Sequence, residues 1–534
     1  MFQNLLKKIQ CQKIKNSPSG KSTSESGEVQ SHSKKMEKSL EKNVKEIQNC
    51  LGNSNDIKIR EFSFGNEPVI NAALVFIDGL VNSSIITECI MKPLMLCTTQ
   101  IKGNVIEEVQ KHIICSGDVT EACDKDKIVE SCLAGDTVLL IDGNSCGLII
   151  SSKGWDKRSV TEPQTEAVAR GPREGFTENY RTNTSLLRRK IRNPALRFDT
   201  FTIGEKTRTM VSVVYLKNVA DTNLIDEIKR RLRSIQVDSI LESGYIEQYI
   251  EDAPFSFFPT IGKSEKPDVV AAKILEGRAA ILVDGTPFVL TAPLLFTESF
   301  QTAEDYYART LYASVIRLLR FLSFMIAVFA PAFYVAATTF HQEVIPTTLM
   351  FTIATAREST PFPAVIEAFI LLMTFEILRE AGLRLPRPAG QAVSIVGALV
   401  MGDAAVAAGL VGAPMVVTIA ISAMAQFVTP EHQDAIVLLR IVILILAANF
   451  GGYGILLGIV GLMIQLGSLE SFGVPYFAGV APMLLKNWKD LLIRAPLWTM
   501  TKRPLEFKCQ DATRQVSKIP PEEIKVPLNG DDKQ

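Results

Sequence analysis

The apolar run Phe321–Phe340 is the feature that most limits how this chain can fold. It carries no charged side chain, and it is long enough to cross a bilayer, which takes about 20 apolar residues in a helix. A polar segment, Ile345–Pro363, follows it, and a second apolar run, Ala364–Glu380, contains acidic residues. Acids at membrane depth are costly and usually face a cavity, a partner or an ion path. The two runs therefore predict a membrane-spanning part whose acids have a function.

Charge is unevenly distributed along the chain, although the formal net charge is zero. Charged residues are concentrated before Glu304, whereas the part from there to Met483 is apolar. This split predicts an α+β membrane protein, in which a cytosolic N-terminal α/β region precedes a polytopic α-helical membrane domain. The predicted division is a disordered polar tail at residues 1–60, two α/β subdomains at 61–195 and 196–303, a transmembrane helical domain at 304–483 and a cytosolic tail at 484–534.

An internal repeat is visible in the N-terminal region, where short β-branched runs alternate with amphipathic helices. One copy, GDTVLLIDGNSCGLII, begins at Gly135, and the other, GRAAILVDGTPFVLTAP, begins at Gly277. Each has a strand pattern, then Asp-Gly, then another apolar run, which is typical of a hairpin. We therefore expect two related α/β subdomains, divided near Arg192–Phe198.

The flanks of the apolar runs predict the orientation. The N-terminus does not resemble a signal peptide, because Lys7 and Lys8 fall where an apolar core is needed. Basic residues before the first run, such as Arg317, and after the last, such as Lys486, belong on the cytoplasmic side. We expect both termini inside, with four or six crossings. The nine cysteines show no CxxC pair and are expected to be reduced, as in a cytosolic domain.

Several polar residues fall within the apolar half. On a helix over Ala364–Glu380, Glu367 and Thr374 share one face and Glu376 points to the opposite face. These acids either line an aqueous path or, for Glu376, lie at the cytoplasmic interface. The threonine-rich segment before them either lines a wet passage or dips into the headgroups. The candidate pore or gate residues are Thr352, Thr355, Glu358, Glu367, Thr374 and Glu376, and the candidate intramembrane ion pair is Asp403 with Arg440.

The motifs of common enzymes are missing from the sequence. It has no HExxH, GxSxG or GxGxxG pattern, and its four histidines are isolated. We therefore expect no enzyme activity, no cofactor and no metal site. The basic segment Thr161–Phe198 has too few aromatic residues for base stacking, so nucleic-acid binding is not expected. It is either a solvated helix face or a docking surface.

Three segments of the chain carry a specific pattern. They are TEPQTEAVARGPREGFTENYRTNTSLLRRKI (Thr161–Ile191), PFPAVIEAFILLMTFEILREAGLRLPRPAGQAVSIVGALVMGDAAV (Pro361–Val406) and SFGVPY (Ser471–Tyr476). They resemble the A subunit of the GerA-type spore germinant receptors, and the resemblance covers roughly Gly65–Pro504.

This resemblance implies a role in spore germination. Such a receptor has a B subunit similar to an amino-acid transporter, which is thought to bind nutrients, and a C subunit that is a lipoprotein. The A subunit is expected to self-associate into a ring in the spore inner membrane and to form a germinant-gated cation channel. The alternative is a non-conducting scaffold that relays a signal from its partners. A secondary transporter acting alone is less favoured, because the membrane half shows no repeated pair of interrupted spans.

Overall fold

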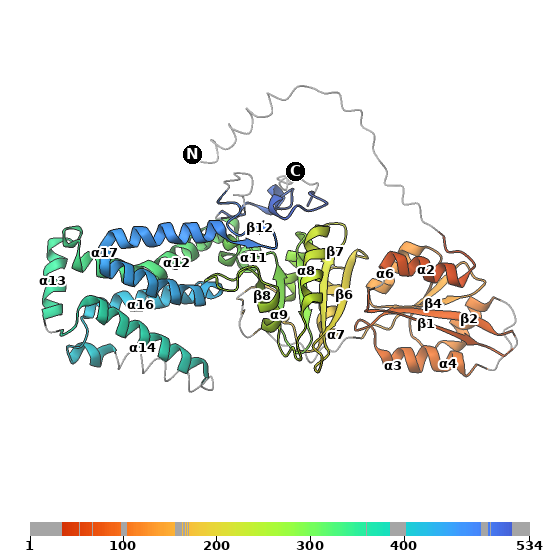
Figure 1. The fold of residues 1–534 in the computed structure, drawn as a ribbon. Helices are drawn as coiled ribbons and strands as arrows, with labels where there is room; N and C mark the ends of the chain where they lie inside the picture. The colour runs from red at the N-terminus through yellow and green to blue at the C-terminus, as the bar shows by residue number, and fades with distance from the viewer. Residues whose placement is uncertain are drawn as a thin grey trace, which may run out of the picture.

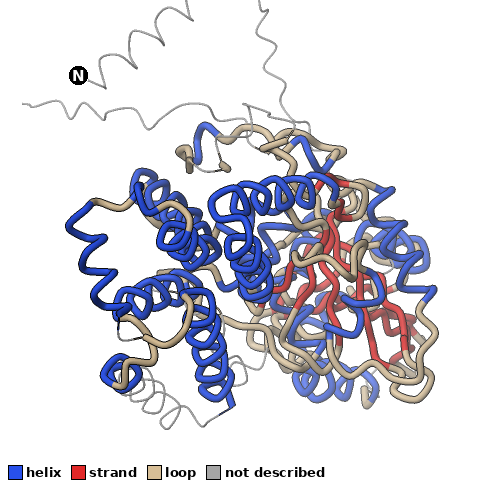
Figure 2. The backbone as a smooth tube through the Cα atoms, turned by 60° about the vertical axis from the view of Figure 1, so that its left-hand side comes forward, coloured by secondary structure: helices blue, strands red, loops and turns tan. Residues whose placement is uncertain are grey.

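The computed structural model describes residues 35–514, with gaps at 53, 67, 98–103, 155–162, 164–165, 167, 169, 359, 385–401, 482–489 and 492. Three parts lie in a row: a first sheet unit at one end, a second sheet unit in the middle and a helical bundle at the other end (Figure 1). The turned view in Figure 2 shows the strands gathered on one side of the molecule and most long helices on the other. The predicted combination of sheets and helices is confirmed.

The first sheet unit is a five-stranded sheet with helices on both faces. Its strand order is β1-β2-β4-β5-β3. Successive side chains of a strand point to opposite faces, so Val75 of β2 packs with α2 and α6, and Leu74 packs with α3 to η2. The strands are β1 (Ile57–Phe64), β2 (Ile70–Ile77), β3 (Val119–Ala122), β4 (Thr137–Ile141) and β5 (Gly147–Ile150), and the helices are α2 (Leu40–Leu51), α3 (Ser83–Ile85), η1 (Ile86–Met91), α4 (Lys92–Met95), α5 (Val105–Glu108), η2 (Val109–Ile113) and α6 (Lys125–Leu133).

The second sheet unit is built in the same way, with strand order β6-β7-β9-β10-β8. Val213 of β7 packs with α8 and α9, and Val214 packs with α7 and α10 on the other face. The strands are β6 (Leu196–Ile203), β7 (Thr209–Leu216), β8 (Gly262–Ser264), β9 (Ala279–Val283) and β10 (Val289–Ala292), and the helices are α7 (Tyr180–Lys190), α8 (Thr222–Ser234), α9 (Ser243–Ile250), α10 (Pro267–Leu275), η3 (Phe296–Phe300) and α11 (Glu304–Tyr307).

The internal repeat is confirmed by the topology. In each unit the first, second, fourth, fifth and third strands lie side by side in that order. The predicted Asp-Gly hairpins join β4 to β5 and β9 to β10, where Gly143 and Gly285 have φ values of 81° and 89°, a conformation that glycine adopts without strain. All of these strand pairs are antiparallel. The alternation of strands and helices therefore does not produce the parallel sheet of α/β folds.

Each unit begins with a helix that the expected division placed elsewhere, α2 in the tail and α7 in the first subdomain. Asn43 of α2 accepts a hydrogen bond from the N–H of Glu37 and donates one to its carbonyl oxygen. Asn183 of α7 makes the same two bonds with Thr177. These contacts make α2 and α7 equivalent, so the units start before them rather than at residues 61 and 196. The expected disordered tail thus contributes α2 to the first core.

The two sheet units meet at a buried ion pair. Arg188 of α7 donates two hydrogen bonds to the carboxylate of Asp56, with Nε–Oδ2 at 2.7 Å and Nη2–Oδ1 at 3.2 Å, and neither side chain is more than 2% exposed. The guanidinium also lies over the ring of Phe198, 4.8 Å from its centroid. A bidentate pair fixes orientation as well as charge. This part of the basic segment therefore joins the units and is not a solvated helix face.

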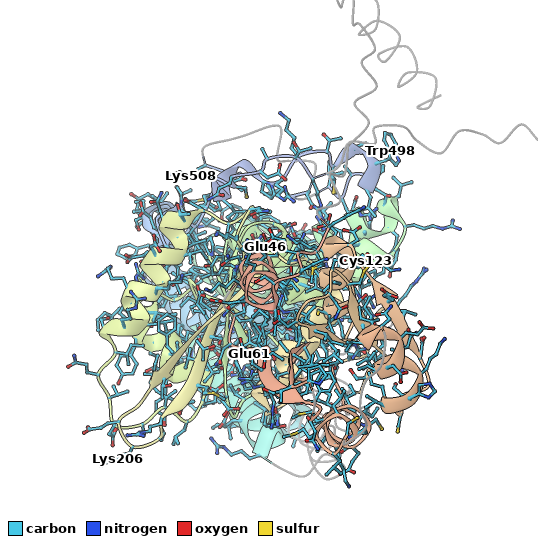
Figure 3. The ribbon with its side chains drawn as sticks, turned by 90° about the vertical axis from the view of Figure 1, so that its right-hand side faces the viewer. Glu46, Glu61, Cys123, Lys206, Trp498 and Lys508 are labelled. Carbon is cyan, nitrogen blue, oxygen red and sulfur yellow. A yellow bond between two sulfur atoms is a disulfide. The ribbon has the colours of Figure 1, made fainter. Side chains whose placement is uncertain are left out.

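A disulfide between Cys123 and Cys146 contradicts the expectation of reduced cysteines. Cys123 follows β3 and Cys146 precedes β5, and these strands pair with Ala122 opposite Gly147. The two cysteines are therefore brought together by the strand register, which cysteine spacing does not reveal. Figure 3 labels Cys123 in the first sheet unit.

The helical bundle follows the second sheet unit. Within the described residues, two helices are long and apolar enough to cross a membrane by length and composition, Thr310–Thr339 and Pro430–Ser468. The first of them, α12, packs through Phe324 and Val328 into the core of the bundle. The elements are α12 (Thr310–Thr339), η4 (Gln342–Val344), α13 (Thr347–Glu358), α14 (Ala364–Arg384), α16 (Ala413–Phe427), η5 (Pro430–His432), α17 (Gln433–Ser468), β11 (Glu470–Ser471) and β12 (Val474–Pro475).

The long element α17 is a hairpin of two helical arms. Gly451, with φ 59° and ψ −136°, reverses the chain beside Phe340 at the end of α12. A Cβ atom at Gly454 would overlap the carbonyl oxygen of Leu446, so the arms approach where only glycine fits. The glycine-rich run Asn449–Gly454 is thus the turn between the two arms. Because the arms fold back, both ends of α17 lie near the second sheet unit.

The chain returns to the second sheet unit after the bundle through η7 (Leu497–Thr499) and η8 (Leu505–Phe507). Phe507 is buried under the guanidinium of Arg278, which lies 4.3 Å from the ring centroid. Arg503 donates a hydrogen bond of 2.9 Å to the last carbonyl oxygen of α10. Trp498 and Lys508 mark this segment along one edge of the molecule (Figure 3). The expected C-terminal tail is thus docked in its described part.

Candidate functional site

An exposed polar stripe lies on α13, at the end of the bundle away from the sheet units (Figure 1). Thr348, Thr352 and Thr355 follow one another at four and three residues, which places them on one helix face, and Glu358 continues the stripe. All four are exposed. The hydroxyls of Thr352 and Thr355 donate to carbonyl oxygens one turn back, at 3.1 and 2.9 Å. Their oxygen atoms therefore remain available as acceptors.

A pocket of about 450 Å³ lies beside this stripe and mixes charged, hydroxyl and aromatic side chains. Two of the candidate pore residues, Thr355 and Glu358, line this pocket. Its lining is Phe351, Ala354, Thr355, Arg357, Glu358, Thr360 and Phe362.

Glu367 is enclosed within the bundle and only 1% exposed. Its Oε1 accepts a hydrogen bond from the Thr360 hydroxyl at 3.2 Å, and its Oε2 accepts one from the N–H of Gly412 at 3.1 Å. The Nε of Arg357 lies 3.8 Å from Oε1. Gly412 is the N-cap of α16, and a carboxylate is favoured at a helix N-terminus by the unpaired N–H groups and the helix dipole. Glu367 therefore joins α13, α14 and α16.

Arg440 pairs with Glu376, which corrects the expected Asp403–Arg440 pair. Arg440 lies on the first arm of α17 and is 2% exposed, and its Nη2 is 3.0 Å from Oε1 of Glu376. It also donates to Gln426 at 2.8 Å and to Ser422 at 3.3 Å. Asp403 is exposed. The side of α17 that carries Arg440 faces α14 and α16, so Glu376 is the acid within reach.

Glu376 is shared by two cations, because Arg379 also contacts it, at 2.7 Å. The network extends to α12, where the Ser422 hydroxyl donates to the carbonyl oxygen of Ala327 at 2.8 Å. The two acids of α14 thus have different neighbours: Glu367 contacts α13 and the start of α16, and Glu376 contacts α17. Thr374 is half-buried on the same helix. The structure therefore separates the candidates into an exposed group on α13 and two buried polar clusters.

An aromatic cluster around His432 joins the second sheet unit to the bundle. The imidazole lies 5.6 Å from Phe258, 5.2 Å from Phe296 and Phe300 and 5.3 Å from Phe324, measured between ring centroids. Three of these rings belong to the sheet unit and Phe324 belongs to α12. The two imidazole nitrogens have no hydrogen-bond partner within the described part of the chain. Because packed interiors deform little, this junction couples the unit to the helices.

A buried ionic cluster lies next to that junction. Arg317 is 2.9 Å from Asp305 and 2.8 Å from Asp490, and Arg320 is 2.9 Å from Asp305. Burial raises the pKa of Tyr306 beside them, and the negative charge of Asp490 is the second largest cause of the rise. These arginines were expected as basic flanks of the first span. They are instead turned inward and hold the start of α12 to the sheet unit.

The fold and these junctions define a class of protein: a duplicated antiparallel sheet region fixed to a bundle that contains long apolar helices. Residues 45–506 match the family described as Bacillus/Clostridium GerA spore germination protein, and the chain therefore belongs to that family.

Relatives of known name are similar over most of their length. Spore germination protein KA of Bacillus subtilis (strain 168) is 46% identical over 479 residues, which cover 89% of this chain and 88% of that protein. The uncharacterized membrane protein YfkQ of the same strain is 45% identical over 468 residues, 87% of this chain and 90% of that protein. Spore germination protein GerLA of Bacillus cereus is 40% identical over 480 residues, 90% of this chain and 97% of that protein.

A solved structure also matches. The crystal structure of the N-terminal domain of the A subunit of the Bacillus megaterium spore germinant receptor GerK3 is 37% identical, covering 49% of this chain and 97% of that chain with a TM-score of 0.40.

The resemblance to A subunits of GerA-type germinant receptors is thus confirmed. The family is one of germinant receptor subunits and is not known as an enzyme family.

Sequence reasoning missed Gln426, Ser422 and His432. Each is a single polar residue in or beside an apolar segment, a pattern that fits many exposed positions equally well. A polar residue on the inner face of α16 was the available signal for Gln426 and Ser422, since they are four residues apart on one face. No pattern in the sequence indicates the aromatic surroundings of His432.

Proposed function

We propose that this chain is the membrane subunit of a nutrient germinant receptor that triggers spore germination, and that several copies form a germinant-gated cation channel. The stripe of Thr348, Thr352, Thr355 and Glu358 carries the proposal. It exposes three hydroxyls and a carboxylate on one face of a helix at the end of an apolar bundle. Around a symmetry axis, such stripes make rings of hydroxyl and carboxylate oxygens, which are the groups that cation channels use.

In this proposal α12, α16 and both arms of α17 cross the membrane, which gives a polytopic bundle with four crossings. The sheet units and both termini lie on the cytoplasmic side of the spore inner membrane. Two observations support that orientation. Arg317 and Arg320 lie at the end of the bundle that bears the sheet units, and the connection after α12 from His341 to Thr348 contains no lysine or arginine.

The proposed partners are a transporter-like B subunit, a lipoprotein C subunit and further copies of this chain in a ring. Nutrient binding then belongs to the B subunit, and the A subunit conducts. In this scheme the enclosed carboxylate of Glu367 keeps α13 in place, and the exposed Glu358 faces the permeating ion.

The test is cation flux through liposomes that contain this chain with its B and C partners, with and without candidate nutrients. Glu358→Gln and Thr352→Val are expected to change the conductance or the selectivity of nutrient-triggered flux. Glu343→Gln, an exposed acid outside the stripe, is the matched control and is expected to leave flux unchanged. Nutrient-triggered flux that is the same in both stripe variants would refute the pore assignment.

A non-conducting scaffold is the second candidate, and the junction around His432 favours it. The sheet unit and the bundle share one aromatic core there, which suits a subunit that relays a signal between its cytosolic and membrane parts. Phe258→Ala is expected to uncouple the two parts under this alternative. If nutrient response is lost with Phe258→Ala, and the liposomes stay sealed to cations under every condition, the scaffold is favoured over the channel.

A further inference from the structure

We infer that an aromatic surface on the second sheet unit lies in the headgroup layer of the bilayer. The aromatic surface consists of Tyr245 and Tyr249 on α9 and Phe255 in the loop that follows. Tyr245 and Tyr249 are one helical turn apart and 43% and 54% exposed, and Phe255 is 99% exposed. No residue of the described chain covers Phe255. The inference rests on the proposed membrane crossing of α12.

Two carboxylates near the aromatic surface, those of Glu242 and Asp252, are held by other groups. Glu242 caps α9 by accepting a hydrogen bond from the N–H of Gly244. Asp252 pairs with Arg231 at 2.6 Å, and its side chain is only 21% exposed. Burial raises the pKa of Glu247, which lies on the same helix. The exposed residues of α9 are Tyr245, Gln248 and Tyr249, and Glu247 between them is partly buried.

The depth of the surface follows from α12. A helix rises 1.5 Å per residue, so the hydrocarbon core of about 30 Å takes about 20 residues. Counted back from the outer end at Thr339, these residues reach Arg320. Phe324 then lies about 6 Å inside the hydrocarbon boundary.

The depth of Phe255 follows from its distance to Phe324, measured through the aromatic cluster around His432. Phe258 is 5.6 Å from Phe296, and Phe296 is 6.0 Å from Phe324, between ring centroids. Phe255 is three residues from Phe258, which is at most about 10 Å of chain. Phe255 is therefore within reach of the headgroup layer, which extends about 5–8 Å beyond the hydrocarbon core on each side.

The exposed side chains on the first turns of α12 also indicate contact with lipid headgroups. Leu311, Val315 and Leu318 are exposed at spacings of four and three residues, which forms an apolar face. Arg317 on the same turns is buried and points inward to Asp305. An apolar outer face therefore begins before the hydrocarbon boundary, as expected for a helix whose first turns lie among lipid headgroups.

The chemistry of the aromatic surface fits a lipid interface. Tyrosine rings are enriched where a membrane meets water, because the ring body is apolar and the hydroxyl remains hydrated. A second copy of this chain is the competing occupant, since copies are proposed to form a ring.

The test uses p-benzoylphenylalanine, a photo-crosslinking residue, in the full chain reconstituted into liposomes with radiolabelled phosphatidylglycerol. It replaces Phe255, whose own ring makes the change small. Phe333, exposed in the middle of α12, is the positive control for lipid contact. Leu96, exposed in the first sheet unit beside α4, is the negative control, because α4 lies at the opposite end of the molecule from the bundle (Figure 1).

We expect lipid adducts at position 255 at a level within about threefold of those at 333, and none above background at 96. Lipid adducts at 333 without adducts at 255 would overturn the inference and leave the membrane crossing of α12 intact. Lipid adducts at neither 255 nor 333 would overturn the membrane crossing itself. A crosslinked dimer of this chain from position 255, without lipid adducts there, would assign the surface to contact between copies.

Discussion

The buried pair of Arg188 and Asp56 gives the sharpest prediction about how the two sheet units hold together. Arg188→Met leaves the Asp56 carboxylate buried at 2% exposure without its bidentate partner. Breaking a buried pair from one side costs about 3–5 kcal/mol, because the remaining charge is desolvated and uncompensated. The double variant Arg188→Met with Asp56→Leu replaces both charges by apolar groups, which is often neutral. We therefore expect the single variant to be strongly destabilised and the double variant to recover most of the loss.

The assay is native-state hydrogen exchange of the full chain in detergent micelles, read by mass spectrometry on peptides from α2 and α7. A loss of 3–5 kcal/mol corresponds to exchange that is faster by about two to three and a half powers of ten. Lys92→Met is the control, because its pair with Glu88 is exposed on both sides and such pairs contribute little. Unchanged exchange in Arg188→Met, or a double variant no better than the single one, would refute the reasoning.

Three further predictions concern other contacts. Burial raises the pKa of Glu166 to about 7, so its contribution to stability is present below about pH 4.5 and is lost as the pH rises through 7. Glu166→Gln should remove this pH dependence from the hydrogen exchange of the strand that contains its partner Ser264. An unchanged pH profile in the variant would contradict this. Cys123→Ser opens a disulfide that spans 23 residues to Cys146 and should lower stability by about 3 kcal/mol in chemical denaturation, whereas a non-reducing peptide map without this link would disprove the disulfide. Phe507→Ala should cost about 3–5 kcal/mol in the docking of the C-terminal segment, seen as faster proteolysis there, and equal cleavage rates would count against that docking.

Local patterns in the sequence determined much of the architecture. The Asp-Gly pairs predicted both hairpins, because a short turn with a glycine in the left-handed conformation depends only on neighbouring residues. The charge-free run Phe321–Phe340 falls in α12 up to the last helical residue, Thr339, and the glycine-rich run Asn449–Gly454 contains the reversal in α17. For the candidate site, the sequence singled out Thr352 and Thr355 in a polar segment, and the structure placed them on one exposed face of α13.

Tertiary structure decided which groups meet. The sequences of α2 and α7 have few residue types in common. Their equivalence rests on Asn43 and Asn183, because each side chain bonds the backbone N–H and carbonyl oxygen of the residue six positions earlier. Arg440 pairs with Glu376 rather than Asp403 because of the faces that α14 and α17 present to each other. Such contacts join residues far apart in the chain, so they depend on how whole elements pack and leave no short-range pattern in the sequence. The chain's own periodicity therefore set the helices, hairpins and apolar spans, while packing between them chose the ion pairs, the disulfide and the burial of Glu367.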